Sequence, residues 1–130
     1  MDLKKIDTLK LAEDGFEYNF VMPISQEETD IVIDLYGVGS KAYKEAVAKR
    51  DEYFRKTNKI TEEKLNEFRI QILAKCTRGW KGIEEEDATG KLVPVKFSHE
   101  EALRIYAAYP LIADGVDGAI HSVVERLEKN

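Results

Sequence analysis

The only tryptophan of the chain, Trp80, lies between two glycines at the point where one long helical pattern ends and the next has not begun. A buried tryptophan contributes a large apolar area, and flanking glycines let neighbouring backbone approach it or adopt a positive φ angle. We therefore predict that the segment Arg78-Gly79-Trp80-Lys81-Gly82-Ile83 forms a corner at which the two halves of the molecule meet.

The length and charge of the chain restrict the classes of protein to consider. With 130 residues, 43% of them apolar, the chain is long enough for one core, and we expect a single domain over 1–130. A net charge of -5 argues against a nucleic-acid binder, which needs a surplus of basic residues on one face. Cys76 is the only cysteine, and no apolar run approaches the roughly 20 residues of a membrane span. These features favour a cytosolic protein with no membrane partner.

Residues 7–36 have the alternating pattern of extended strands. The alternating apolar residues are Leu9, Leu11, Phe16, Tyr18, Phe20 and Met22 before a polar loop, and Ile31, Ile33 and Leu35 after it. The dipeptide Asp14-Gly15 is typical of a tight turn. The pattern predicts a small antiparallel sheet between Phe16 and Leu35. Such a sheet is marginally stable alone and needs helices packed on its apolar face.

Apolar residues recur at helical spacing through residues 40–128. We predict four helices, near 40–57, 61–77, 98–108 and 110–128. Ser40 and Thr61 are suitable N-cap residues, Ser98 and Glu101 form a capping box, and Pro110 suits a first helical turn. The fold class predicted is therefore α+β, mostly α, with a small N-terminal antiparallel sheet packed on about four helices.

The last predicted helix has the widest apolar face. Its members are Ile112, Val116, Ala119, Ile120, Val123, Val124 and Leu127. The face is wider than one neighbouring helix would cover, and an exposed face of that size would mark an interaction site. We therefore predict a partner-binding surface formed by Trp80, Ile112, Val116, Ile120, Val123, Val124 and Leu127. For Trp80 we expect a largely buried position where the 61–77 helix meets the C-terminal half, and the alternative is an exposed anchor for a partner, because tryptophan is enriched at binding hot spots.

Two glycines interrupt the same helix. Gly115 and Gly118 each cost roughly 0.5–1 kcal/mol in a helix interior. We expect either a close approach of neighbouring backbone or a bend in the helix at this point.

Few residues suit catalysis or metal binding. A nucleophile needs a base within hydrogen-bond reach, and the candidates are Cys76 with His99 or His121. Cys76 falls on an apolar helical face, so a hydrolase would require its thiol to be solvent-reactive. The acidic run at 84–87 lacks the alternating ligand spacing of a calcium loop. We therefore expect no enzyme activity, no cofactor and no bound metal.

Two groups of short motifs cover most of the chain. The first comprises Phe16-Glu17-Tyr18, Pro23, Glu28-Thr29-Asp30-Ile31, Gly39-Ser40 and Tyr43. The second comprises Gly79-Trp80-Lys81-Gly82-Ile83, Gly90, Val95-Lys96-Phe97-Ser98, Glu100 and Tyr109-Pro110. Their order and spacing resemble the tail assembly chaperones of long-tailed bacteriophages of the lambdoid siphovirus type. The sequence departs from that family at 98–100, where an asparagine-containing helix cap is common.

The resemblance implies a non-enzymatic assembly factor made in the host bacterial cytoplasm and absent from the mature virion. It implies that the chain binds the tape measure protein and keeps it soluble. It also implies that the chain helps to recruit tail tube protein, in relatives through a longer form made by a ribosomal frameshift. It also implies a homo-oligomer. The competing hypothesis is a small structural tail or head-completion subunit that is retained in the virion, and composition does not separate the two.

Overall fold

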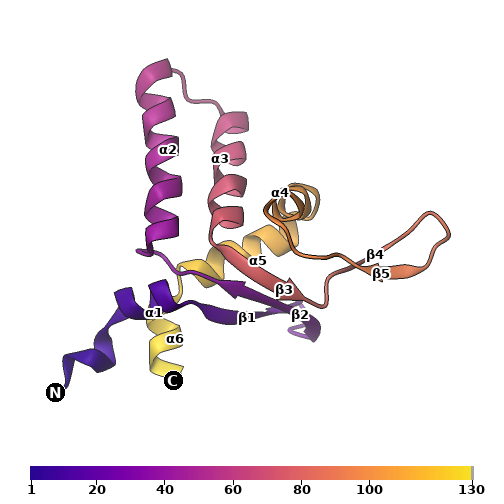
Figure 1. Ribbon diagram of the computed structural model, residues 1–130, viewed down its shortest axis with the longest axis horizontal. Coiled ribbons are helices and arrows are strands. Elements are labelled where there is room, and N and C mark those ends of the chain that lie inside the picture. The colour runs from indigo at the N-terminus through magenta and orange to yellow at the C-terminus, as the bar shows by residue number, and fades with distance from the viewer. Residues whose placement is uncertain (130) are drawn as a thin grey trace.

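The computed structural model describes residues 1–129, and its helices and strands form an α+β fold that is mostly α (Figure 1). In chain order the elements are the 3₁₀ helix η1 (Leu3–Ile6), α1 (Thr8–Asp14), β1 (Phe16–Val21), β2 (Glu28–Leu35), α2 (Lys41–Thr57), α3 (Glu62–Lys75), β3 (Thr77–Lys81), β4 (Glu84–Glu86), β5 (Leu92–Pro94), α4 (His99–Ala108), α5 (Pro110–Ile120) and α6 (Val123–Lys129). The fold class predicted from the sequence is confirmed. Within residues 1–129, no helix combines the length and apolar content that a bilayer span requires.

The main sheet contains three antiparallel strands in the order β1-β2-β3. The predicted antiparallel sheet between Phe16 and Leu35 is confirmed, with Tyr18 opposite Ile33. The third strand was not predicted, because the glycines around Trp80 weaken the strand pattern there. Trp80 lies opposite Ile33 on β2, so it is on the same face of the sheet as the core residues of that strand.

The N-terminal residues 8–14 form helix α1, and the extended structure predicted for this segment is wrong. The Asp7 side chain accepts a hydrogen bond from the Lys10 backbone N–H at 2.9 Å, which caps the helix. Gly15, with φ of 86°, ends the helix, and its N–H bonds to the carbonyl of Leu11. The dipeptide Asp14-Gly15 therefore stops a helix instead of turning a hairpin.

The predicted helix 110–128 is divided into α5 and α6. The carbonyl of Ile120 accepts a hydrogen bond from the backbone N–H of Val38 at 3.0 Å, so it is used by a loop instead of by the next helical turn. The Ser122 hydroxyl donates to the carbonyl of Ala119 at 2.9 Å. The apolar periodicity continues across this break, which is why the sequence did not indicate it.

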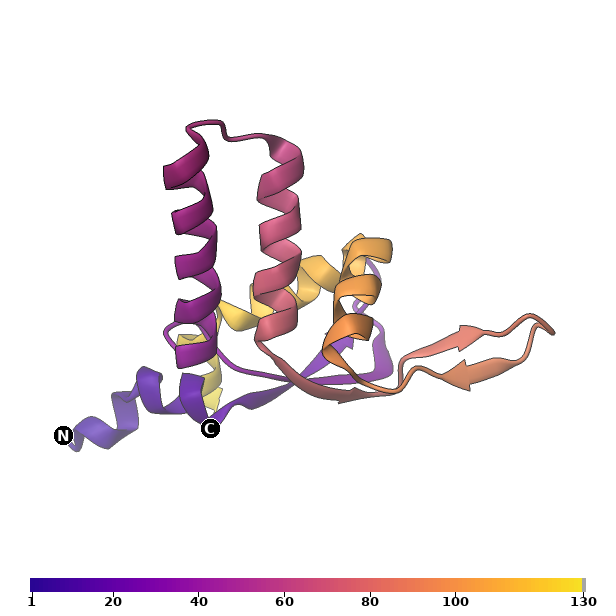
Figure 2. The same cartoon turned by 45° about the horizontal axis from the view of Figure 1, so that its top comes forward.

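The core lies between the sheet and helices α3, α4 and α5 (Figure 2). Its largest fully buried side chains include Ile33, Leu35, Leu73, Ile105, Tyr106, Val116 and Ile120. Cys76 is fully buried among them, as predicted, and burial raises the pKa of its thiol to about 12. Helices from both halves of the chain therefore share one apolar interior with the sheet.

Two hairpins extend outward from this core, and the C-terminal end of α3 is itself part of the core. Helices α2 and α3 form an antiparallel hairpin on one side of the sheet, and β4 and β5 form a hairpin that projects from the end of β3 (Figures 1 and 2). The outer part of the helical hairpin is held by Tyr53, Phe54 and Phe68, whose ring centroids lie within 5.6 Å of one another. Both projections present side chains to solvent on more than one face.

The two glycines of α5 differ in their surroundings. A methyl group added at Gly115 would overlap the hydroxyl oxygen of Tyr18 on β1, whereas one added at Gly118 would meet no atom within 4 Å. A close approach is therefore found at Gly115 alone, and it comes from a tyrosine side chain instead of the backbone that was expected.

These surroundings predict that replacing glycine with alanine has opposite effects on stability at positions 115 and 118. Gly115→Ala is expected to lower the free energy of unfolding by about 1–3 kcal/mol, because Tyr18 must move out of a packed position. Gly118→Ala is expected to raise it by about 0.4–1 kcal/mol, because alanine reduces the entropy of the unfolded chain. Urea denaturation of both variants checks this, and equal effects at the two positions would contradict it.

Candidate partner-binding surfaces

Trp80 is half-buried on β3 and is held by contacts within the chain. Its indole N–H donates to the carbonyl of Val95 at 2.7 Å. Its ring meets Phe97 edge-on, with centroids 5.0 Å apart, and lies 6.4 Å from the ring of Tyr106 on α4. Trp80 thus joins the sheet to the segment before α4, which agrees with the predicted corner.

The apolar face predicted for partner binding is mainly inside the protein. Val116, Ile120 and Val123 are buried. Ile112 and Leu127 are half-buried, and Val124 is exposed. The width of this face is explained by its contacts with the chain's own sheet and helices, so Val116, Ile120 and Val123 do not form the exposed surface that was predicted. Periodicity alone does not distinguish these contacts from contacts with another protein.

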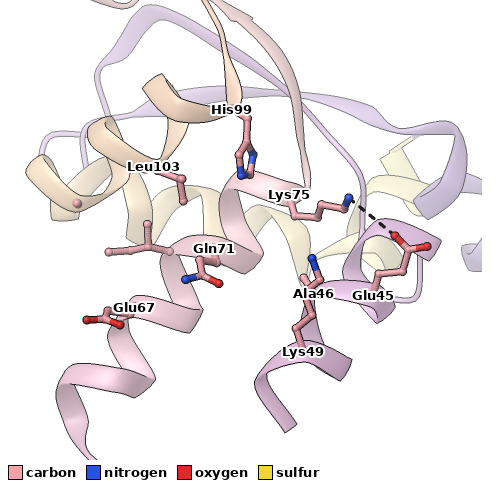
Figure 3. Close-up of a pocket in the computed structure, with 10 residues that line it drawn as sticks. Glu45, Ala46, Lys49, Glu67, Gln71, Lys75, His99 and Leu103 are labelled. Carbon is pink, nitrogen blue, oxygen red and sulfur yellow. Dashed lines mark ion pairs between the residues drawn. The ribbon is translucent and has the colours of Figure 1, made fainter. Parts of the chain in front are cut away.

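A groove lies between α2, α3 and α4 (Figure 3). It encloses about 400 Å³ and is lined by Glu45, Ala46, Lys49, Glu67, Ile70, Gln71, Lys75, His99, Leu103 and Ala107. Its apolar part combines Ala46 from α2, Ile70 from α3, and Leu103 and Ala107 from α4. Alanine side chains are too short to fill the space where three helices meet, so the groove remains open.

The groove carries charges of both signs. Lys75 of α3 faces Glu45 of α2, with Nζ 3.8 Å from the carboxylate (Figure 3). Glu67 is paired with Lys64 at 3.0 Å. These side chains are partly exposed, so each pair contributes little to stability. The charges around the apolar part would instead limit which side chains a bound partner can place there.

A second surface, here named the apolar patch, lies where the end of β1 meets the junction of α4 and α5. It is a hollow of about 260 Å³ lined by Phe20, Met22, Ala108, Tyr109, Pro110, Leu111 and Ile112. No lining side chain is charged. Ile112 is the residue of this patch that the sequence predicted, and Tyr109-Pro110 belongs to the motifs quoted above.

An ion-pair network joins the β4–β5 hairpin to the edge of the apolar patch. Arg104 of α4 binds both carboxylate oxygens of Glu85, at 2.6 and 3.1 Å, and the Tyr109 hydroxyl donates to the same carboxylate at 2.7 Å. The hydrogen bonds from Arg104 and then from Tyr109 lower the pKa of Glu85. Glu85 is therefore ionised at neutral pH and orients the Tyr109 ring.

The candidate catalytic residues do not have the surroundings that thiol catalysis needs. Cys76 is fully buried, and the raised pKa of its thiol disfavours the nucleophilic thiolate. His99 and His121 are exposed, and His121 contacts Tyr43 and Asp117. Among residues 1–129, no three His, Cys, Asp or Glu side chains are grouped so that they could hold a metal ion.

Comparison of the chain with protein-family models, with curated proteins and with solved structures found no match. What the groove and the apolar patch can bind follows from the chemistry of their own residues. Both combine apolar side chains from helices with charged side chains at the edge, which suits contacts with an amphipathic segment of another protein.

Proposed function

We propose that the chain is a tail assembly chaperone of a long-tailed bacteriophage. It binds the tape measure protein in the host bacterial cytoplasm, keeps that protein soluble and helps to recruit tail tube subunits. It acts as a homo-oligomer and leaves before the virion is complete. The observation that carries the proposal is the groove between α2, α3 and α4, whose apolar side chains are open to a further helix.

The groove suits a long helical partner for a geometric reason. An α-helix places apolar side chains at every third or fourth position, so one apolar stripe can contact Ile70, Leu103 and Ala107 together. The polar face of the same helix would lie near Lys49 and Gln71 at the groove's edge. A partner with a long apolar stripe offers many equivalent binding positions, and covering that stripe prevents its aggregation.

The proposal is tested by co-expression with the cognate tape measure protein. The chain is expected to raise the soluble fraction of the tape measure protein and to co-purify with it. Ala107→Glu places a charge in the groove and should weaken the complex by about tenfold or more, equivalent to at least ~1.4 kcal/mol. Ala48→Glu is the matched control, because Ala48 is an exposed helical alanine outside the groove. Equal solubility of the tape measure protein without this chain, and no complex, would overturn the proposal.

Mass spectrometry of purified phage particles separates the chaperone from a virion subunit. A chaperone is expected to be absent from finished particles, whereas a tail or head-completion subunit would be present in a fixed ratio to the tail tube protein. Detection at such a ratio would replace the chaperone assignment with the structural one.

A further inference from the structure

We infer that the apolar patch is a docking site for a cationic amphipathic segment, one in which lysine or arginine residues flank apolar side chains. This inference goes beyond the chaperone function, because it concerns a surface separate from the groove and specifies the partner's charge. If the chain is a tail assembly chaperone, the segment belongs to the tape measure protein. The chemistry of recognition is the same for any other protein that supplies such a segment.

The apolar part of the site comes from two regions that are distant in the sequence, the end of β1 and the junction of α4 and α5. Met22 follows β1, Tyr109 joins α4 to α5, and Leu111 lies in the first turn of α5. Met22 is 39% exposed, Tyr109 43% and Leu111 55%, although all three line the same hollow as buried Phe20. Apolar side chains gathered in one hollow are costly to leave in water, and such patches mark interaction sites. The hollow therefore favours the apolar side chains of a partner.

Carboxylates surround this patch on three sides. The Met22 backbone N–H donates to the carbonyl of Glu27 at 2.9 Å, so exposed Glu27 is next to the patch. The Glu85 carboxylate is bound to the Tyr109 hydroxyl at the second side. On the third side, Asp114 follows Leu111 by three residues on α5, which places the two side chains on neighbouring positions of one helix face.

The basic side chains near the patch are already engaged. Arg104 pairs with both Glu85 and Glu101. Arg69 pairs with Asp114 at 2.7 Å and with Asp117 at 3.1 Å. Each guanidinium thus serves two carboxylates. Within residues 1–129, Glu27 has no ion pair. The edge of the patch keeps an excess of negative charge.

This charge distribution selects among partners. A nucleic acid, an anionic membrane surface or an acidic segment would be repelled by the carboxylates, whereas lysine or arginine residues would be attracted. The carboxylates are at the surface, so the attraction acts over roughly 8–10 Å at physiological salt and weakens as salt rises. Apolar contact and positive charge are therefore both needed for binding.

Two synthetic peptides test the inference on the full chain. They share one helical face of leucines, and the flanking positions carry lysine in one and glutamate in the other. In an NMR titration, the lysine peptide is expected to shift the amide signals of Met22, Tyr109 and Leu111 and to bind at least about tenfold more tightly than the glutamate peptide. Raising the salt concentration should weaken its binding.

Matched variants separate the patch from other exposed apolar residues. Leu111→Ser should weaken binding of the lysine peptide by about tenfold, whereas Leu65→Ser, at an exposed leucine of α3, should leave it unchanged. Glu27→Gln should reduce both the affinity and its dependence on salt. Equal binding of the two peptides, or shifts confined to the groove between α2, α3 and α4, would overturn the inference. Neither result would affect the co-expression test of the chaperone function.

Discussion

Replacing Tyr106 with alanine is expected to lower the free energy of unfolding by about 3–5 kcal/mol, the range for truncating a large aromatic side chain in a core. Tyr106 is 1% exposed and lies between the sheet and α3. Its truncation would leave a cavity beside Trp80, whose ring it contacts. Urea denaturation monitored by circular dichroism measures the loss.

The hydroxyl group of Tyr106 has a separate and smaller role. The Thr77 hydroxyl donates its one hydrogen to the carbonyl of Leu73 at 2.8 Å, so the Tyr106 hydroxyl, 2.7 Å away, is the donor in the bond between the two side chains. Tyr106→Phe removes this bond without opening a cavity, and about 1 kcal/mol should be lost. A phenylalanine variant as unstable as the alanine variant would show that the hydrogen bond, not the packing, stabilises this site.

Charged substitutions at two adjacent residues of α6 are expected to have very different effects. Val123 is 2% exposed and packs near Gly37 and Ala12, whereas Val124 is 60% exposed. Val123→Glu is expected to lower the free energy of unfolding, because roughly 1.5–3 kcal/mol from burying the valine side chain is lost. The glutamate carboxylate would also lose its contact with water if α6 stayed packed on α1. Val124→Glu is expected to change stability by no more than about 0.5 kcal/mol.

The Val123→Glu substitution is also expected to destabilise one part of the structure more than the rest. Because α6 is a short helix that packs mainly on α1, Val123→Glu should detach α6 from α1 before the sheet unfolds. Hydrogen exchange would then increase in residues 8–14 and 123–129 and stay slow in the buried strand β2. Protection of α6 equal to that in the Val124→Glu protein would contradict the observed burial. The sequence pattern predicted instead that both valines lie on one exposed face.

Parts of the fold could be predicted because local chemistry and the final structure agree. Ser40, Thr61 and Ser98 each accept a hydrogen bond from the backbone three residues later, as N-cap residues do. The antiparallel sheet between Phe16 and Leu35 was predicted because one face of it is apolar. Helix α1 was missed because its seven residues show too few apolar positions to separate period two from period 3.6.

Other parts depend on contacts between distant residues. β3 is a strand because β2 provides a partner for its backbone, although glycine at position 79 weakens the strand pattern. The break between α5 and α6 requires the hydrogen bond from Val38, which is 82 positions before Ile120 in the sequence. No periodicity within one helix contains that information.

The candidate surfaces were predicted only in part, for the same reason. The sequence identified Ile112 and the exposed Val124, but it assigned buried Val116 and Ile120 to the same surface. The groove depends on the spacing of three helices, and the patch depends on β1 ending beside the α4–α5 junction. Two sequence signals did lie at these surfaces: Tyr109-Pro110 at the patch, and the small residue Ala46 within α2.

The packing of α6 against α1 also fixes the position of the C-terminal end of α6, to which the additional residues of a longer form would be joined. Arg126 of α6 lies over the ring of Phe16, at the start of β1, whereas the apolar patch begins at the other end of that strand. The six residues of β1 span about 17 Å between these ends. A domain joined after α6 could therefore hold a second protein while the patch holds the first. The linker would then set the local concentration of one ligand around the other, and the chain would act as a tether that brings two assembly partners together.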